Sequence, residues 1–243
     1  MSKTFDEIVN YRRAVRNFDP SIELVTEKVK HCIELATLAP ASSNMQLWEF
    51  YHITDEDMMK KISAACLNQQ AARTAKQMVV FVTRPDLYKK RAKAILTFEK
   101  ENIKRYSPSE RVEPRIKRTE KYYGQLMPFL YGRFFGLYGF LRKTLTTGTG
   151  FFRPIVHEVT ENDLRVVVHK TCALAAQTFM LAMSDAGYDT CPLEGFDSRL
   201  LKKALKLPGV AEINMVIPCG VRLPEGVHGD RFRVPFSEVY RKI

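Results

Sequence analysis

Three arginines surround a bend near the N-terminus: Arg12, Arg13 and Arg16. The planar guanidinium groups of arginines one and three residues apart around such a bend can converge on a single phosphate. Arginine clusters are also common on protein surfaces, where they are simply solvated. From these residues alone, a phosphate site and a solvated basic turn are equally good interpretations.

A second stretch, from Ala41 to Trp48, holds small amide and hydroxyl side chains followed by a large aromatic one. Its polar members are Ser42, Ser43, Asn44 and Gln46. Groups of this kind can form hydrogen bonds to a polar heterocycle without adding charge. Serine and asparagine also suit ordinary turns, and for this stretch taken alone a turn is the favoured interpretation.

A third stretch, from Pro192 to Asp197, is a turn with a glycine close after a proline. Gly195 lets the backbone of this turn approach a flat ligand, because glycine has no Cβ atom to keep the ligand away. The chain contains no dinucleotide fingerprint, P-loop, zinc-protease motif or hydrolase nucleophile elbow, and its five histidines show no ligand spacing. We therefore expect no metal site and expect an organic cofactor to supply the chemistry.

Apolar periodicity predicts the elements that position these stretches. Residues 171–186 are apolar on every side of a helix, which predicts a buried helix, and Gly187 is suited to end it in a left-handed conformation. Helices that separate buried strands indicate a sheet covered on both faces. The other predicted helices are 5–11, 26–38, 55–67 and 198–207, and the predicted strands are 49–53, 78–82 and 213–221.

The segment from residue 84 to 160 differs in character from the rest. Residues 84–121 hold thirteen Lys and Arg against six Asp and Glu, and residues 122–141 are rich in Tyr, Phe and Gly. Charge followed by aromatic residues is typical of a membrane-surface element, a nucleic-acid face or a lid over a planar ligand. A packed, lid-like segment is favoured over membrane contact, because the aromatic run lacks the moment of a long interfacial helix.

Length and composition limit the classes of protein that fit. A chain of 243 residues with 45% hydrophobic and 27% charged residues suits one large globular domain or two small ones. The net charge of +11 favours anionic partners such as phosphates, nucleic acid or an anionic membrane. Five scattered cysteines and an N-terminus without an apolar signal region indicate a cytoplasmic protein. No uncharged apolar run approaches the ~20 residues of a membrane-spanning helix, so we expect no stable membrane insertion.

Four motifs, in matching order along the chain, resemble those of the FMN-dependent nitroreductase family. They are Arg-Arg-Ala-Val-Arg at 12–16, Ala-Pro-Ala-Ser-Ser-Asn-Met-Gln-Leu-Trp at 39–48, Pro-Leu-Glu-Gly-Phe-Asp at 192–197 and Arg-Phe-Arg-Val-Pro at 231–235. The resemblance covers residues 4–83 and 166–240. It implies an α+β fold with a central mixed sheet flanked by helices on both faces. Residues 1–243 would then form one domain, with an insertion or lid-like segment at 84–160.

The resemblance also implies an activity. Members of the family are obligate homodimers that hold FMN at the subunit interface. NADH or NADPH reduces the flavin, which then reduces a nitro compound, a quinone or a related small acceptor by a ping-pong mechanism. We expect the same here, with a homodimer and a small-molecule acceptor as partners and no nucleic acid.

The matched motifs imply the residues of the site. Arg12, Arg13, Arg16, Arg231 and Arg233 would approach the FMN phosphate and ribityl chain. Ser42, Ser43, Asn44 and Gln46 would form a loop that one subunit lays against the flavin of the other, with Asn68 near the isoalloxazine edge. Pro192, Leu193, Glu194 and Gly195 would form the turn whose backbone faces flavin N5. Glu194 and Gly195 are the implied catalytic positions, because a backbone N–H there stabilises charge on the reduced ring.

Two further hypotheses concern the aromatic segment. Aromatic side chains joined by glycine hinges in residues 122–141 suit a flap that closes over the flavin and gates the acceptor. The alternative to a reductase is a non-catalytic flavin- or phosphate-binding protein that associates with membranes through residues 122–152. A yellow protein that loses its colour when NADH or NADPH is added would favour the reductase.

Overall fold

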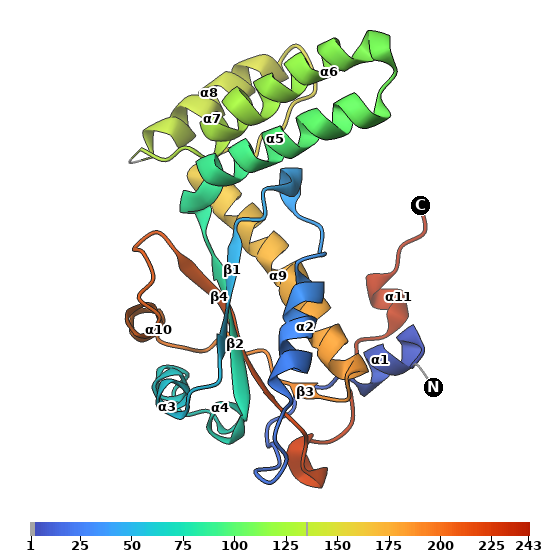
Figure 1. Ribbon diagram of the computed structural model, residues 1–243, viewed down its shortest axis with the longest axis vertical. Coiled ribbons are helices and arrows are strands. Elements are labelled where there is room, and N and C mark those ends of the chain that lie inside the picture. The colour runs from blue at the N-terminus through green and yellow to red at the C-terminus, as the bar shows by residue number, and fades with distance from the viewer. Residues whose placement is uncertain (1–2, 135) are drawn as a thin grey trace.

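A four-stranded sheet with helices on both of its faces lies at the centre of the computed structural model (Figure 1). The structure describes residues 3–134 and 136–243. The strand order across the sheet is β1–β2–β4–β3. The strands are β1 (Trp48–Ile53), β2 (Gln77–Thr83), β3 (Asp189–Thr190) and β4 (Glu212–Gly220).

Helices make up most of the remaining structure. Six of them belong to the part of the chain around the sheet: α1 (Phe5–Tyr11), α2 (Thr26–Ala36), α3 (Glu56–Ala65), α4 (Gln70–Thr74), α9 (Glu161–Asp185) and α10 (Ser198–Ala204). Helix α11 (Phe236–Val239) lies near the C-terminus, and short 3₁₀ turns cover Ser42–Asn44, Pro85–Leu87 and Pro224–Gly226. The predicted helices and strands are present, with ends that differ by at most a few residues except at the start of α9.

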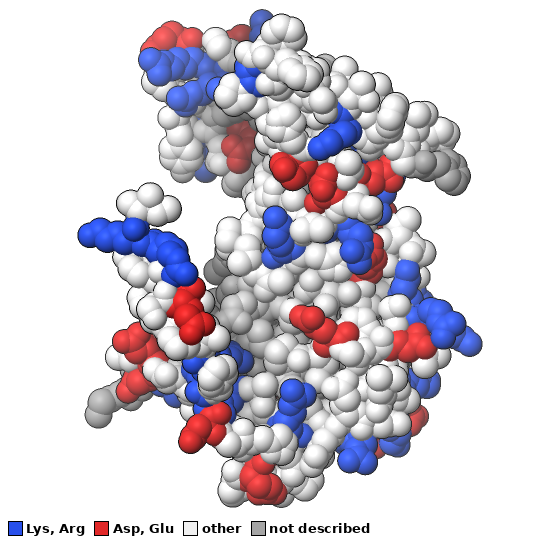
Figure 2. Space-filling model, turned by 180° about the vertical axis from the view of Figure 1, so that it is seen from behind, with Lys and Arg blue, Asp and Glu red and all other residues white. Residues whose placement is uncertain are grey.

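The remaining helices form a layer beyond one end of the sheet (Figure 1). They are α5 (Tyr88–Tyr106), α6 (Ser109–Lys121), α7 (Met127–Tyr131) and α8 (Leu137–Gly150), with a π-helical turn at Tyr122–Leu126. An apolar cluster that includes Met45, Met127 and Val168 joins this layer to the sheet domain. Figure 2 shows a broad uncharged surface at the upper right of the molecule, over this layer.

The sheet differs in one respect from the mixed sheet that we expected. Its three ladders, β1 with β2, β2 with β4 and β3 with β4, are all antiparallel. Within the described residues, the parallel component is a single bridge between Ala14 and Thr190. The N-terminal turn pairs with β3 over one residue only, which is too short to add a parallel strand to the sheet.

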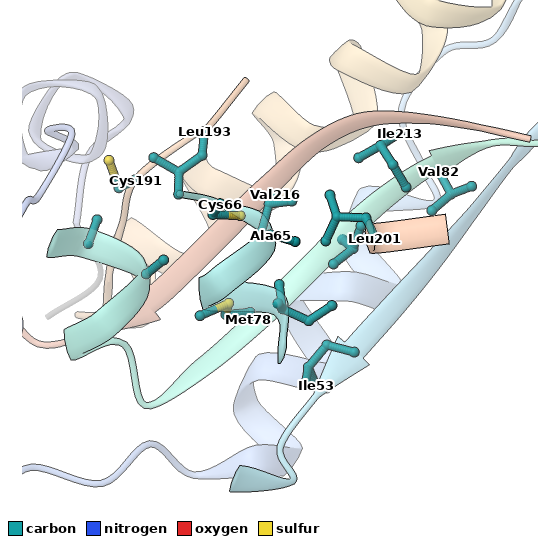
Figure 3. Close-up of a cluster of buried hydrophobic side chains, with 14 of the residues drawn as sticks. Ile53, Ala65, Cys66, Met78, Val82, Cys191, Leu193, Leu201, Ile213 and Val216 are labelled. Atoms are coloured by element: carbon teal, nitrogen blue, oxygen red, sulfur yellow. The ribbon is translucent and has the colours of Figure 1, made fainter. Parts of the chain in front are cut away.

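Strand β2 is buried along its whole length, as its continuous apolar run predicts. Because side chains alternate across a strand, Met78, Val80 and Val82 face α3 and α10. Figure 3 shows part of this cluster, in which Leu201 of α10 and Ala65 of α3 lie over the sheet. The intervening β2 residues pack on the other face against α2 and α9. The two core clusters thus fix the sheet between two helical layers.

Helix α9 runs ten residues further toward the N-terminus than the predicted helix. A capping box formed by Thr160 and Asp163 starts it, and Gly187, with a φ of 81°, follows its end as predicted. The expectation of complete burial is wrong, because Leu174 is 46% exposed on an apolar stripe that nothing in the described chain covers. The helix is long and apolar enough to cross a membrane by length and composition. Its other faces, however, contribute to the core beside α2 and the sheet.

Candidate functional site

The backbone of the N-terminal arginine turn is held rigidly by the sheet domain. The amide of Val15 donates to the carbonyl of Thr190 at 3.1 Å, and the amide of Arg16 donates to the carbonyl of Gly226 at 2.7 Å. The side chain of Val15 is fully buried. Arg12, Arg13 and Arg16 therefore extend from a backbone whose position is fixed on both sides.

The C-terminal arginines lie beside this turn although more than 200 residues separate them in sequence. Arg231 donates to the carbonyls of Val9, Asn10 and Arg12 at 3.3, 2.9 and 2.6 Å, so it fixes the tail against the end of α1. Together the two segments line a pocket of about 340 Å³. Its charged and titratable lining residues are Arg12, Arg13, Arg16, His228, Asp230, Arg231 and Arg233.

The pocket has a large excess of positive charge. Burial lowers the pKa of Arg12, and the nearby charges of Arg231, Arg233 and Arg13 lower it further. In the described part of the chain, the ion pairs formed by arginine all lie elsewhere. No acceptor for the guanidinium of Arg12 or Arg16 is found among the described residues. Such a set of converging, unpaired cations fits a bound anion with several oxygen acceptors.

The Pro192–Gly195 turn starts at the edge of this pocket. It follows Cys191, whose pKa is raised by burial while the charges of Arg16 and Arg12 act against the rise. Leu193 exchanges two backbone hydrogen bonds with Val216, at 2.8 and 3.0 Å, which fixes the turn on β4. Residues 191–195 span at most about 14 Å when extended, so Gly195 lies within about 14 Å of Cys191, whose thiol is within the electrostatic range of Arg16 and Arg12.

Glu194 and Gly195 are exposed at the tip of this turn. Among the residues that the structure describes, neither of their amide N–H groups has an acceptor, while the carbonyl of Gly195 accepts from Gln69 Nε2 at 2.7 Å. A Cβ atom added to Gly195 would come no closer than 3.5 Å to Gln69. The fold of this chain therefore does not require a glycine there, which leaves close approach of a ligand as the physical reason for one.

Asn68 is brought near this turn by its neighbour Gln69 but faces a different space. It adopts a left-handed conformation with a φ of 51°, and it lines a pocket of about 500 Å³ on the outer surface of α3 and α4. This larger pocket shares no lining residue with the arginine pocket. Asn68 therefore lies close to the Pro192–Gly195 turn but does not line the arginine pocket.

The Ser42–Gln46 loop lies far from the arginine pocket within this chain. Its apolar member Met45 packs in the cluster that contains Val168 of α9, whereas α1 contacts Ser184, which donates to the carbonyl of Ile8. Sixteen residues of helix separate Val168 from Ser184, which corresponds to about 24 Å. The loop and the arginine pocket are therefore near opposite ends of α9 (Figure 1).

The backbone of this loop is strained, and two tyrosines of the helical layer hold it by hydrogen bonds. Ser43, Asn44 and Gln46 have φ values of 51°, 53° and 47°, a region that residues with side chains rarely adopt. Tyr122 Oη and Ser43 Oγ are 2.7 Å apart, and Tyr123 donates to the carbonyl of Ser43 at 3.1 Å. Strained backbone of this kind is found preferentially at functional sites.

The site also includes residues that the sequence patterns did not indicate. His228 lines the arginine pocket, Gln69 contacts Gly195, and the two adjacent tyrosines support the serine loop. The only signal in the sequence was indirect, because Gln69 adjoins Asn68 and the tyrosines open the aromatic segment. Their partners are more than 75 residues away in the chain.

The chain is similar to one described protein family and to individual proteins of known sequence. The model of the family described as "Nitroreductase family" matches residues 9–221. MhqN of Bacillus subtilis, whose name describes it as an NAD(P)H nitroreductase, is 23% identical over 96% of this chain and 96% of its own. Protein DrgA of Synechocystis sp. is 27% identical over 90% of this chain and 84% of its own.

Solved structures resemble the whole chain in fold. A nitroreductase of Exiguobacterium sibiricum in complex with FMN superimposes with a TM-score of 0.69, at 21% identity and with 100% of this chain and 99% of that chain covered. A nitroreductase family protein of Streptococcus pneumoniae gives a TM-score of 0.68, at 20% identity, and covers 99% of this chain and 100% of its own. At these identities the likeness concerns the fold, which is the α+β architecture expected from the motifs.

Proposed function

The chain belongs to the nitroreductase family, and from this premise we propose that it is an FMN-dependent oxidoreductase. Bound FMN would carry electrons from NADH or NADPH to nitro compounds, quinones or related small acceptors. The donor and the acceptor would bind alternately at the same site, which is a ping-pong mechanism. The observation that carries the proposal is the pocket of unpaired arginines beside a turn with two free amide groups. The NAD(P)H nitroreductase MhqN and the FMN complex of the Exiguobacterium protein support the choice of donor and cofactor.

Of the five arginines, some would bind the FMN phosphate and the others would hold the C-terminal segment in place. The guanidinium of Arg231 donates hydrogen bonds to backbone carbonyls, and that of Arg13 donates to the carbonyl of Gly229 at 2.8 Å. These two would hold the C-terminal segment in place. Arg12, Arg16 and Arg233 have guanidinium groups that are free or bind only a neighbouring carbonyl, so these three would take the phosphate dianion of FMN.

The glycine turn would act on the flavin ring. An amide N–H held at a fixed position stabilises negative charge that develops opposite it, and it needs no reorganisation during the reaction. The free amides of Glu194 and Gly195 lie on a backbone that Leu193 anchors to β4, so they suit this role toward flavin N5. Gly195 would permit the ring to approach the backbone closely.

Replacement of Gly195 by alanine tests whether this glycine is required for stability or for flavin reduction. We expect Gly195→Ala to fold with an unchanged melting temperature, because the added methyl group clears Gln69. Flavin reduction by NADH should slow by on the order of 10–100-fold, because a weakened charge-assisted hydrogen bond costs about 1.5–3 kcal/mol. Stopped-flow absorbance of the flavin measures this rate. The control is Gly209→Ala, at a turn with open space around it; equal rates in both variants would contradict the assignment.

A homodimer is part of the proposal. Leu38 and Phe5 are 77% and 67% exposed, and together with α9 they line an apolar depression of about 380 Å³. The exposed apolar stripe of α9, which includes Leu174, continues this surface. A second subunit on it would cover the stripe and could bring its own Ser42–Gln46 loop, which is remote from the arginine pocket within one chain, against the flavin of the first.

The helical layer at 84–160 is proposed as an insertion that covers the flavin on the acceptor side. Its tyrosines 122 and 123 already contact the strained loop at Ser43. Tyr122→Phe should raise the KM for acceptors by about 2–10-fold, because one hydrogen bond is worth about 0.5–1.5 kcal/mol, and should leave FMN bound. Steady-state kinetics with a quinone and a nitro compound measure the change. Tyr106→Phe, on an exposed side chain, is the control, and acceptor kinetics that match this control would argue against a lid.

A cytoplasmic location belongs to the same proposal. All five cysteines are free and buried, and burial raises the pKa of Cys66 to about 11. Buried neutral thiols without partners are typical of proteins in a reducing compartment.

A visible spectrum of the purified protein tests the proposed function. We expect a yellow protein whose flavin absorbance falls when NADH or NADPH is added without oxygen and returns when a quinone is added. A yellow protein that responds to neither donor would instead indicate a non-catalytic flavin-binding protein. A colourless protein that also fails to take up added FMN would reject the cofactor.

A further inference from the structure

An apolar surface on the outer side of the helical layer is not used by the proposed reaction. We call it the α8 face, and its members are Leu137, Phe140, Leu141, Leu145, Phe151, Phe152 and Val156. Leu137, Leu141 and Leu145 follow one another at intervals of four residues, so they lie on the same side of α8. Phe140, Phe151 and Phe152 are 71%, 83% and 91% exposed. Single exposed apolar residues are ordinary, but a contiguous group of large ones marks an interaction site.

The outward direction of this face follows from how α8 is anchored. Arg142 is buried on the opposite side of the helix and donates to the carbonyls of Val159, Phe129 and Gly132 at 2.7, 2.9 and 3.0 Å. Gly139 packs closely against the start of α9, where an added Cβ atom would lie 3.1 Å from the amide of Glu161. These contacts fix the inner side of α8 against the chain, so its leucines and Phe140 face outward and are exposed.

Residues 121–157, which carry the α8 face, have charge of one sign, and the carboxylates beside them begin at Glu158, next to α9. No Asp or Glu occurs between Glu120 and Glu158. Exposed cations border the apolar residues: Lys121, Arg133, Lys143 and Arg153. Apolar and aromatic side chains flanked by Lys and Arg, without acidic residues, are the combination that binds anionic membrane surfaces.

We propose that the α8 face is a peripheral docking surface for an anionic lipid bilayer. Phe151 and Phe152 enter the interface between headgroups and acyl chains, and Lys143 and Arg153 contact the anionic headgroups. Helix α8 has 14 residues and is therefore about 21 Å long, shorter than the ~30 Å hydrocarbon core, so it lies on the membrane and does not span it. The layer extends beyond the sheet, at a distance from the N-terminal turn (Figure 1), which leaves the arginine pocket open to solvent.

Charge decides between a membrane and a second copy of the chain as the occupant. Two α8 faces placed against each other would bring Arg133, Lys143 and Arg153 of both copies together, and no carboxylate between residues 121 and 157 is present to pair with them. Anionic lipids neutralise the same cations. The face that suits a second copy is the apolar surface around Leu38 and Leu174, on the sheet domain.

Vesicle flotation of the full-length protein tests the proposal. The wild-type protein should float with vesicles of phosphatidylglycerol and phosphatidylcholine and remain behind with phosphatidylcholine alone. Phe151→Ser/Phe152→Ser should lower the bound fraction at least tenfold, and Lys143→Gln/Arg153→Gln should remove the preference for the anionic lipid. The matched control is Phe98→Ser on α5, which is 62% exposed outside the face and should bind like the wild type.

Two results would overturn the proposal. One is a wild-type protein that fails to float with anionic vesicles; the other is a phenylalanine variant that floats as well as the control. If the phenylalanine variant has a lower molar mass by light scattering than the wild type, and the wild type does not bind vesicles, the face is a contact between copies of the chain. Circular dichroism checks the fold of each variant, and Phe152→Ser alone replaces the double variant if that one unfolds. Flotation requires no turnover, so failure of the proposed reductase activity would not affect the result.

Discussion

Replacing Arg12 and Arg233 together by alanine is expected to weaken FMN binding by on the order of 10²–10⁴-fold. Each arginine can donate charge-assisted hydrogen bonds to the phosphate, worth about 1.5–3 kcal/mol apiece, and 1.4 kcal/mol corresponds to a factor of ten. The two side chains suit the test because neither is needed to anchor the backbone, in contrast to Arg231. Flavin fluorescence during titration of the apoprotein with FMN measures the affinity.

The control for this prediction removes the same amount of charge elsewhere. Arg111→Ala/Arg118→Ala lies on the exposed part of α6, away from the arginine pocket. The two double variants have equal net charge, so a general electrostatic effect would weaken FMN binding in both. Full FMN occupancy in Arg12→Ala/Arg233→Ala would refute the phosphate assignment.

Introducing a carboxylate on each side of the apolar surface is expected to abolish the dimer and to release FMN with it. In Leu38→Asp/Leu174→Asp, two charges would have to be buried without partners when the subunits associate, which costs several kcal/mol each. In the proposed dimer the Ser42–Gln46 loop of one subunit completes the flavin site of the other, so the monomer would lack part of that site. Light scattering coupled to detection of flavin absorbance measures both quantities in one experiment.

The matched control places the same two charges on a different exposed apolar pair. Leu200→Asp/Val210→Asp alters side chains that are 50% and 47% exposed near α10, outside the proposed interface. It should remain a flavin-loaded dimer. A stable monomer that retains FMN, in the wild type or in the Leu38 variant, would contradict the coupling between dimer and cofactor.

Local patterns in the sequence determined most of the secondary structure. The apolar run around Val80 predicted a strand buried on both faces, and the amphipathic spacing of residues 26–38 predicted α2. Gly187 ends its helix with a left-handed residue, as expected. These predictions depend on neighbours within a few residues, which is the range over which backbone conformation and the period of side-chain burial are set.

The family motifs extended the predictions to a fold and a list of site residues. They named the Arg12 turn and the Arg231 pair as one phosphate site, and the structure brings both to a single pocket. The spacing of the arginines alone did not distinguish a phosphate site from a solvated turn at Arg12. More than 200 residues separate the two groups, and their meeting depends on the sheet order and on the path of the tail.

Tertiary contacts decided the roles of individual residues. Arg231 and Arg233 are alike in sequence, yet one binds three backbone carbonyls and the other keeps its guanidinium near the pocket. Residues 171–186 are apolar on every side of the helix, but the single chain covers only some of these sides and leaves Leu174 exposed. The tyrosine contacts to Ser43 also bridge about 80 residues of chain. Sequence determined which groups this protein has and how each segment folds locally. Which groups meet was decided by long-range packing, because such contacts form only when the whole core closes around them.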